Sequence, residues 1–209
     1  MPLRNLLLLP NSPIGIDEAA ADPYAGYLVY DSFTDANGTA LAAHTPEKDV
    51  VGGGWGNIKG TGFAIQSDAL DCNGSTDQLC SIDCGQADGI RVRLENITLG
   101  HFTGVMIRDA GTAPTLACYL GLFDVDANDV SIWLCNGSYV KKAADAEVCA
   151  PGDSYNSIEI RVSGNKLTLY VDDVERCDYT DATFNAQTFV GVFGYTEDGT
   201  WDAEIFKVS

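Results

Sequence analysis

Five residues combine the chemistry and the spacing of a ligand-binding surface. They are Trp133, Tyr170, Arg91, Arg93 and Arg161. Both aromatic residues stand between two aliphatic ones, in the runs 132–134 and 169–171. If these runs are β-strands, alternation puts the aliphatic side chains in a core and the rings on an outward face, which the arginines could share. Aromatic rings beside polar groups suit the binding of sugars. An equally good interpretation is that these rings pack against a second layer of the protein or against another subunit.

The acidic segment 124–129 could bind calcium. Oxygen-bearing side chains alternate in it as they do at the start of a calcium loop, at Asp124, Asp126 and Asn128. The sixth position is aspartate where such a loop needs glycine, and the twelfth is cysteine where it needs glutamate. A hairpin turn is therefore the favoured interpretation. Calcium, here or between Asp31 and Asp202 if the chain ends meet, is the alternative, and no other cofactor is expected.

Motifs of catalysis are missing from the sequence. It contains no nucleophile elbow, no phosphate-binding glycine loop and no H-E-x-x-H segment. Only two histidines occur, His44 and His101, and we expect His44 to be a structural hydrogen-bonding residue. The sequence therefore predicts a protein that is not an enzyme.

Composition limits the partners of this chain. It has 209 residues, with 12 Lys and Arg against 30 Asp and Glu, which gives a formal charge of −18. Such a surface repels phosphate backbones, so nucleic acid and anionic lipid are not expected as partners. The apolar run 6–9, closed by Pro10, is too short for a membrane span or for the core of a signal peptide. We expect neither.

Seven cysteines predict disulfides, because they are many for a reduced cytosolic protein and lack the paired C-x-x-C spacing of zinc sites. Cys118 and Cys135 lie equally far from a turn centred between residues 126 and 127, so we expect them to be cross-strand neighbours that could be bridged. Cys72, Cys80 and Cys84 lie in a segment containing Gly, Ser and Asp, where a local disulfide could hold a loop. Since seven is odd, at least one thiol stays free or pairs with another chain.

A two-residue period from residue 30 onward predicts short β-strands. Its best example alternates over 158–162, turns at 164–165, returns over 167–171 and turns again at 172–173 into a third strand. The segment 140–148 is the only helix candidate, and a loop is as good an interpretation of it. Residues 1–28 contain four prolines and keep neither period, so they predict an extended arm before a domain at 29–209.

Two parts of the sequence resemble concanavalin A-like, LamG-like jelly-roll domains. The first runs from Asp31 through Gly54-Trp55 to residue 70, and the second covers 158–172, 190–194 and 201–208. Such domains recur in phage virion proteins and in secreted carbohydrate-binding proteins. The resemblance implies an all-β fold, an antiparallel β-sandwich. It says little about activity, because members include lectins, adhesion modules, hydrolases and capsid or tail proteins.

Jelly-roll glucanases similar to this fold carry an E-x-D-x-x-E strand whose two glutamates act as nucleophile and acid. The nearest segment here, 47–52, has glycine in place of the second glutamate and belongs to a glycine-rich stretch. This departure argues against that enzyme class.

The resemblance and the missing motifs together predict a non-catalytic structural protein of a virion surface, such as a capsid decoration or a tail-associated module, with glycan-binding adhesion as an added role. Its partners would be other subunits of the assembly, held through the arm, and cell-surface glycans. Its location would be the virion surface or the extracellular space. The alternative is a secreted carbohydrate-binding module, or a glycoside hydrolase or lyase of the same fold.

Overall fold

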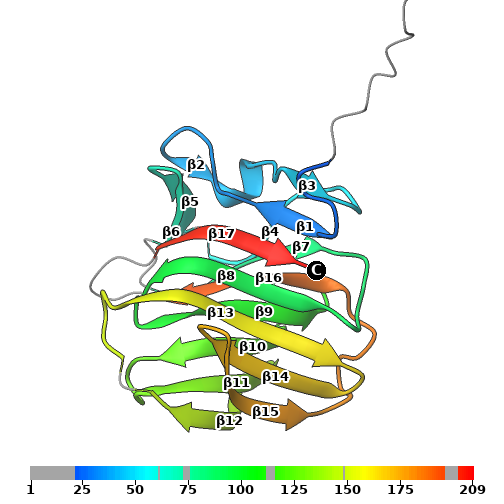
Figure 1. Ribbon diagram of the computed structural model, residues 1–209, viewed down its shortest axis with the longest axis vertical. Helices are drawn as coiled ribbons and strands as arrows, with labels where there is room; N and C mark the ends of the chain where they lie inside the picture. The colour runs from blue at the N-terminus through cyan, green and yellow to red at the C-terminus, as the bar shows by residue number, and fades with distance from the viewer. Residues whose placement is uncertain (1–21, 61, 73–75, 112–115, 148, 196–201) are drawn as a thin grey trace, which may run out of the picture.

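Two antiparallel β-sheets stack into a sandwich in the computed structural model, which describes residues 22–209 except 61, 73–75, 112–115, 148 and 196–201 (Figure 1). Within the described residues the only helix is one 3-10 turn, Leu41–Ala43. The predicted all-β sandwich is therefore confirmed.

The ten-stranded sheet has the strand order β15-β14-β13-β8-β17-β6-β5-β2, with β1 beside β17 and β3 beside β1. Its strands are β1 (Val29–Asp31), β2 (Thr39–Ala40), β3 (Lys48–Asp49), β5 (Phe63–Gln66), β6 (Ala69–Cys72), β8 (Arg91–Thr98), β13 (Ser154–Ser163), β14 (Lys166–Val171), β15 (Val174–Thr180) and β17 (Asp202–Val208).

The seven-stranded sheet has the order β12-β11-β10-β9-β16-β7-β4. Its strands are β4 (Gly56–Lys59), β7 (Gln78–Asp83), β9 (Phe102–Asp109), β10 (Ala117–Asp124), β11 (Asp129–Asn136), β12 (Tyr139–Ala146) and β16 (Phe189–Tyr195).

Alternation along the strands builds two apolar layers. In β10, Tyr119 and Phe123 point into the core between the sheets, while Leu120 and Leu122 belong to a separate cluster on the other face. The core cluster draws on both sheets, as in Ile160 of β13 and Val192 of β16. Both faces of the seven-stranded sheet are therefore apolar. In an ordinary antiparallel sheet with one face in solvent, that face is polar.

The predicted meander of three strands is confirmed. Strands β13 and β14 pair with Val162 opposite Leu167, around the turn at 164–165. Asp172 and Asp173 have φ values of 50° and 64°, the left-handed conformation that a tight two-residue hairpin turn needs, and β15 follows. Local turn chemistry and strand alternation agree here, so the sequence was sufficient.

The helix or loop predicted for 140–148 is wrong, because most of this segment is the edge strand β12. Lysine and alanine have high intrinsic helix propensities, so this segment on its own favours a helix. In the folded chain, however, β12 pairs along β11 from Cys135 opposite Tyr139 to Asp129 opposite Ala146. The hydrogen bonds that β11 gains on its open edge outweigh the weak local preference.

Most of the arm predicted for 1–28 lies outside the described residues. Residues 22–27 form turns, and Leu28 donates a backbone hydrogen bond of 2.7 Å to Val208 of β17. The last residues before β1 are thus attached to the ten-stranded sheet. No helix in the described part of the chain is long and apolar enough to cross a membrane.

Two glycines allow close backbone approach in the middle of the seven-stranded sheet. A Cβ atom on Gly104 of β9 would lie 2.2 Å from the carbonyl oxygen of Gly121, and one on Gly191 of β16 would lie 2.0 Å from that of Cys80. Neither distance is tolerable, so no other residue fits at either position without moving the neighbouring strand.

Candidate functional site

The five residues predicted to bind a ligand divide between the outward faces of the two sheets. Trp133 lies on the outward face of the seven-stranded sheet, packed against the second apolar cluster. The other four lie on strands β8, β13 and β14 of the ten-stranded sheet, where Arg91 is opposite Arg161 and Arg93 is opposite Glu159. The structure therefore brings Tyr170 and the arginines together but separates them from Trp133.

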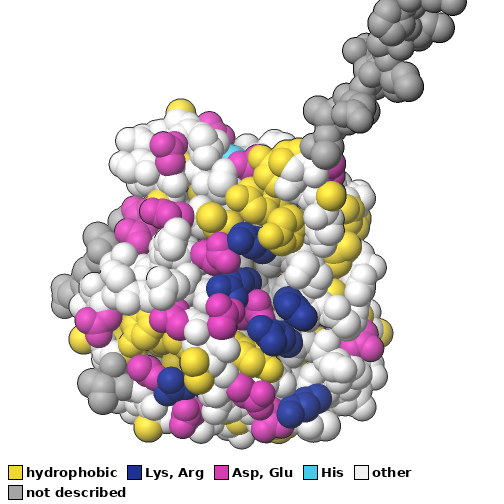
Figure 2. All heavy atoms as spheres, viewed as in Figure 1, with side chains coloured by type: hydrophobic (Ala, Val, Ile, Leu, Met, Phe, Trp, Pro, Cys, Tyr) yellow, Lys and Arg dark blue, Asp and Glu magenta, His cyan; other side chains and the backbone are white. Residues whose placement is uncertain are grey.

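The outward face of the ten-stranded sheet is a ladder of ion pairs. Arg93 lies 2.8 Å from Glu95 and 3.4 Å from Glu159, and Lys207 lies 2.6 Å from Glu95. Figure 2 shows these opposite charges side by side over the middle of the face. Arg161 pairs with Glu159 and stacks on Tyr170, with 3.8 Å between the guanidinium carbon and the ring centre. The aromatic and charged side chains of this face are therefore mostly paired with one another.

Pairing within this ladder also shows in the pKa of Arg93. Burial alone would lower that pKa, but the hydrogen bond to Asp173 and the charges of Asp173, Glu95 and Glu159 outweigh burial and raise it. Arg91 is the exception: its backbone is hydrogen-bonded to Ser209, but its side chain has no hydrogen bond or ion pair to any described residue. It lines a polar hollow of about 200 Å³ with Tyr27 and Lys207.

The outward face of the seven-stranded sheet is apolar instead. The cluster that covers it consists of Ile58, Leu79, Met106, Leu116, Cys118, Leu120, Leu122, Cys135 and Phe193. Phe102, Trp133 and Tyr139 pack against this cluster and stay partly exposed. Together with Phe193 they surround a cavity of about 210 Å³, which we call the aromatic pocket. Leu122 and Asp77 complete its lining.

One rim of the aromatic pocket is a hydrogen-bonded group of three side chains. The Tyr139 hydroxyl donates to Asp77 Oδ2 over 2.9 Å, and Lys59 Nζ donates to the same oxygen over 2.6 Å. Lys59 also lies over the Tyr139 ring, 5.6 Å from its centre. Burial and then the charge of Asp77 raise the pKa of Tyr139, so its hydroxyl keeps its proton and remains a donor.

A second charged group beside the pocket is Lys141, which lies above the ring of Trp133. Its ammonium lies 5.1 Å from the centre of the indole ring and donates to Asp124 over 2.7 Å and to Asp129 over 2.8 Å. Burial alone would lower the pKa of Lys141, but the two carboxylates outweigh burial and raise it. The indole N–H of Trp133 donates to Ser131 over 2.8 Å, which fixes the ring plane. A preset aromatic plane beside fixed charges is a surface that can bind without first becoming ordered.

The predicted hairpin turn at 124–129 is confirmed by the pairing of Asp124 with Asp129. Lys141 occupies the position beside Asp124 that a cation would need, and the exposed Asp126 faces His101 over 3.4 Å. Asn128 has a φ of 52°, as a turn residue does. Among the described residues, no three His, Cys, Asp or Glu side chains are grouped as a metal site would require. The structure thus gives no support to calcium at this loop.

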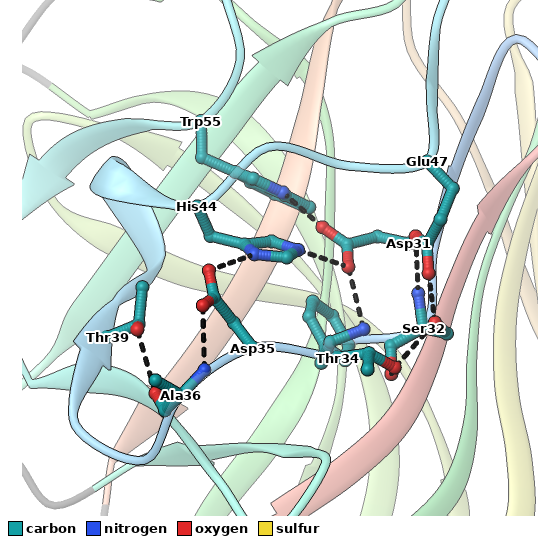
Figure 3. A network of polar contacts seen from close by, with 10 residues as sticks. Asp31, Ser32, Thr34, Asp35, Ala36, Thr39, His44, Glu47 and Trp55 are labelled. Carbon is teal, nitrogen blue, oxygen red and sulfur yellow. Dashed lines mark hydrogen bonds and ion pairs between the residues drawn. The ribbon is translucent and has the colours of Figure 1, made fainter.

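A buried polar network fixes the start of the domain (Figure 3). Asp31 is fully buried and accepts hydrogen bonds from the Trp55 indole over 2.6 Å and the Phe33 backbone over 2.7 Å, while His44 Nε2 lies 3.0 Å away. The other ring nitrogen of His44 lies 3.1 Å from Asp35. Every polar group has a partner, as in a structural network.

The pKa shifts in this network have one physical pattern. Burial raises the pKa of Asp31, although Trp55 and His44 act against it. Burial alone would lower the pKa of His44, but Asp35 and Asp31 outweigh it and raise the pKa. Asp31 lies opposite Phe206 in the sheet, and Asp202 lies four residues, or about 13 Å, further along β17, so the register does not bring the two aspartates together.

The acidic string at 47–52 has a local structural role. The Ser32 backbone donates to Glu47 over 3.0 Å, and Asp49 accepts hydrogen bonds from the backbones of Gly52 and Gly54 over 2.9 and 3.1 Å. Asp49 therefore holds the glycine-rich loop closed, and neither carboxylate borders the aromatic pocket.

Cys118 and Cys135 are direct neighbours across β10 and β11, as predicted. No disulfide is present, however, so the predicted bridges are not observed. The pKa of Cys118 is raised, first by a hydrogen bond with Cys135 and then by burial. A disulfide among Cys72, Cys80 and Cys84 is likewise not observed, and all three residues lie in the sandwich core, on or directly after β6 and β7.

Sequence reasoning missed most of the aromatic pocket. Its members Asp77, Phe102, Tyr139 and Phe193, and Lys59 beside them, come from segments that lie far apart in the chain. The alternation of side chains along β9 and β16 could have placed the two phenylalanines on the outward face. No signal pointed to Tyr139, because the segment that follows it has the composition of a helix.

Comparison with known proteins agrees with the fold. No protein-family model matches the sequence, and no curated protein matches it either. Among solved structures, a carbohydrate-binding module, CBM66 of Bacillus subtilis, has a TM-score of 0.60 at 17% identity and covers 74% of this chain and 94% of its own.

Two further structures are similar over more of the chain. A Bacillus licheniformis β-glucanase has a TM-score of 0.54 at 10% identity and covers 86% of this chain and 96% of its own. The exoplasmic domain of VIP36, solved in a form bound to Ca²⁺ and Man2, has a TM-score of 0.53 at 12% identity and covers 82% and 86%. The chain thus has the concanavalin A-like jelly-roll fold.

Proposed function

We propose that this protein binds carbohydrate in the aromatic pocket and catalyses no reaction. The observation that carries the proposal is the ring of partly exposed aromatic side chains around a cavity with a charged rim. A sugar ring presents C–H groups on its faces and hydroxyls around its edge. Aromatic planes suit the faces, and carboxylate or ammonium groups suit the hydroxyls.

Lack of a carboxylate pair supports the binding role over hydrolysis. A glycosidase of the usual kind needs two carboxyl groups on either side of the bond that breaks. Among the described residues that line the aromatic pocket, only Asp77 carries a carboxyl group, and Lys59 and Tyr139 already bind it. The similar solved structures include both binding modules and a glucanase, so the fold alone does not choose between these activities.

A glycan array tests the proposal with one variant on each sheet face. We expect Trp133→Ala to weaken binding about 30-fold, on the order of 2 kcal/mol, because it removes the main stacking plane. Tyr170→Ala, on the ion-pair ladder, should bind like the unmodified protein. If Tyr170→Ala lost binding and Trp133→Ala kept it, the ligand site would lie on the ten-stranded sheet, with Arg91, Arg93 and Arg161.

Location and partners follow from this proposal. A glycan-binding domain of this kind would meet its ligand outside the cell, on a cell surface or a polysaccharide. Display on a virion surface stays a prediction from the sequence resemblance, since the arm that would anchor it lies mostly outside the described residues. Mass spectrometry of purified virions would test that prediction.

A further inference from the structure

The aromatic pocket is closed along one side by side chains from opposite edges of the sheet. Tyr139 belongs to β12, the first strand in the sheet order, and Lys59 to β4, the last. They meet at Asp77, which comes directly before β7. The hydrogen bonds of these three residues therefore cross the outward face of the sheet. We call Tyr139, Asp77 and Lys59 the edge bridge.

The cavity ends at the edge bridge. Leu122 of β10 lines the pocket, while Leu120 and Cys118, further along the same face of the same strand, are 0% exposed. Leu79 of β7 is equally buried. The ring of Tyr139 reaches Phe193 of β16, with 6.2 Å between the ring centres. Among the described residues, aromatic and aliphatic side chains thus fill the face behind the bridge and leave no passage there for a ligand.

The size of the cavity points to one sugar ring. Its volume of about 210 Å³ is below the roughly 300–1,000 Å³ of ordinary small-molecule sites. A long groove for a polysaccharide would need to be open at both ends, whereas this pocket has a wall on one side.

Charges around the pocket favour a neutral ligand. The carboxylates of Asp77, Asp124 and Asp129 outnumber the ammonium groups of Lys59 and Lys141, and each ammonium is already paired. The chain as a whole carries a formal charge of −18. An acidic sugar would be repelled. Lys59 and Tyr139 both donate to Asp77 Oδ2, and among the described residues none donates to Oδ1, which is the atom that we expect to accept a hydrogen bond from a sugar hydroxyl.

We propose that the aromatic pocket binds the neutral terminal ring of a glycan and does not bind rings inside a chain. This inference rests on the carbohydrate-binding function proposed above. The edge bridge is the feature that excludes an extended chain, and the aromatic side chains hold the terminal ring.

Matched glycans printed on an array test the inference. In each pair, one glycan ends in a given neutral monosaccharide, and in the other the same monosaccharide is capped by a further sugar. We expect at least about tenfold stronger binding to the uncapped member. Equal binding to both members would overturn the inference and leave the carbohydrate-binding function intact. A preference for acidic ends would overturn the choice of a neutral ring.

Absence of binding to every glycan on the array would overturn the proposed function itself, and this inference with it. The two failures are therefore distinguishable, because only the first leaves a glycan-binding protein.

Variants of the edge bridge give a second measurement. Tyr139→Ala should open the wall and bring binding of capped glycans to within a few-fold of uncapped ones. If the alanine variant fails to fold, Tyr139→Phe is measured in its place. It keeps the ring and removes only the hydroxyl, so it should keep most of the selectivity for uncapped glycans. Tyr170→Ala, on the other sheet, is the control and should keep full selectivity. Unchanged selectivity in a folded Tyr139→Ala variant would contradict the role given to the bridge.

Discussion

The outward faces of the two sheets solve the same problem differently. On the ten-stranded sheet, charged side chains neutralise one another across strands, as Arg93 does with Glu95 and Glu159. On the seven-stranded sheet, apolar side chains bury one another, and a partly exposed aromatic rim is left around a cavity. A face whose groups are mutually satisfied gains little from a ligand. A face that leaves aromatic surface exposed beside fixed charges gains more.

We expect the largest loss of stability from breaking the buried network that fixes β1 to the ten-stranded sheet. This network belongs to neither outward face. His44→Ala removes the ion-pair partner of the buried Asp31, which at a pH where His44 is protonated should cost about 3–5 kcal/mol of unfolding free energy. Urea denaturation followed by fluorescence measures this loss. Glycan binding to the remaining folded protein should not change, because the aromatic pocket contains no residue of this network.

This network should also make stability depend on pH. The pKa values of His44 and Asp31 are both raised in the folded state, so each of these two groups binds its proton more tightly in the folded chain than in the unfolded one. The stability that His44 contributes is complete below its unfolded pKa of about 6.5 and is lost as pH rises through its folded pKa. His44→Gln should remove this decline, and a decline of equal size in both proteins would contradict it.

A smaller loss of stability, joined to a loss of binding, is expected from Gly104→Ala in the seven-stranded sheet. The added Cβ would lie 2.2 Å from a backbone oxygen and 2.7 Å from the Cα of Leu122, a residue of the pocket. Overpacking of this kind costs about 1–3 kcal/mol. Gly56→Ala is the matched control, since its Cβ would meet nothing nearer than 3.8 Å. Full glycan affinity in Gly104→Ala would show that the pocket tolerates a displaced strand.

Breaking the ladder on the ten-stranded sheet should matter less. Arg93→Ala should cost about 1 kcal/mol or less, because partly exposed ion pairs contribute little and salt screens them. The glycan array should show no change. Lys166→Ala, which breaks an exposed pair with Asp178, serves as a baseline near zero. A marked loss of glycan binding in Arg93→Ala would mean that the ladder, and not the pocket, is the ligand site.

The smallest effect should come from removing calcium. Because the ammonium of Lys141 already lies between Asp124 and Asp129, a chelator should shift the melting temperature by less than about 1 °C. Differential scanning fluorimetry with and without the chelator measures the shift. A clear drop in melting temperature would restore calcium as a ligand of the rim.

The sequence by itself determined the sandwich, the meander from β13 to β15 and the outward position of Trp133. Alternation of side chains and turn chemistry act over a few residues, so one strand or hairpin shows them. The facing of Cys118 and Cys135 followed from the same local symmetry, and the register confirms it.

Only the tertiary structure decided the rest. It made 140–146 an edge strand, because pairing with β11 outweighs a helical composition, and it placed Trp133 and Tyr170 on different sheets. It also joined Tyr139, Asp77 and Lys59 across the face of one sheet. The contact between Tyr139 and Asp77 joins residues 62 positions apart. It depends on the order of strands in the sheet, and no local pattern in this chain specifies that order.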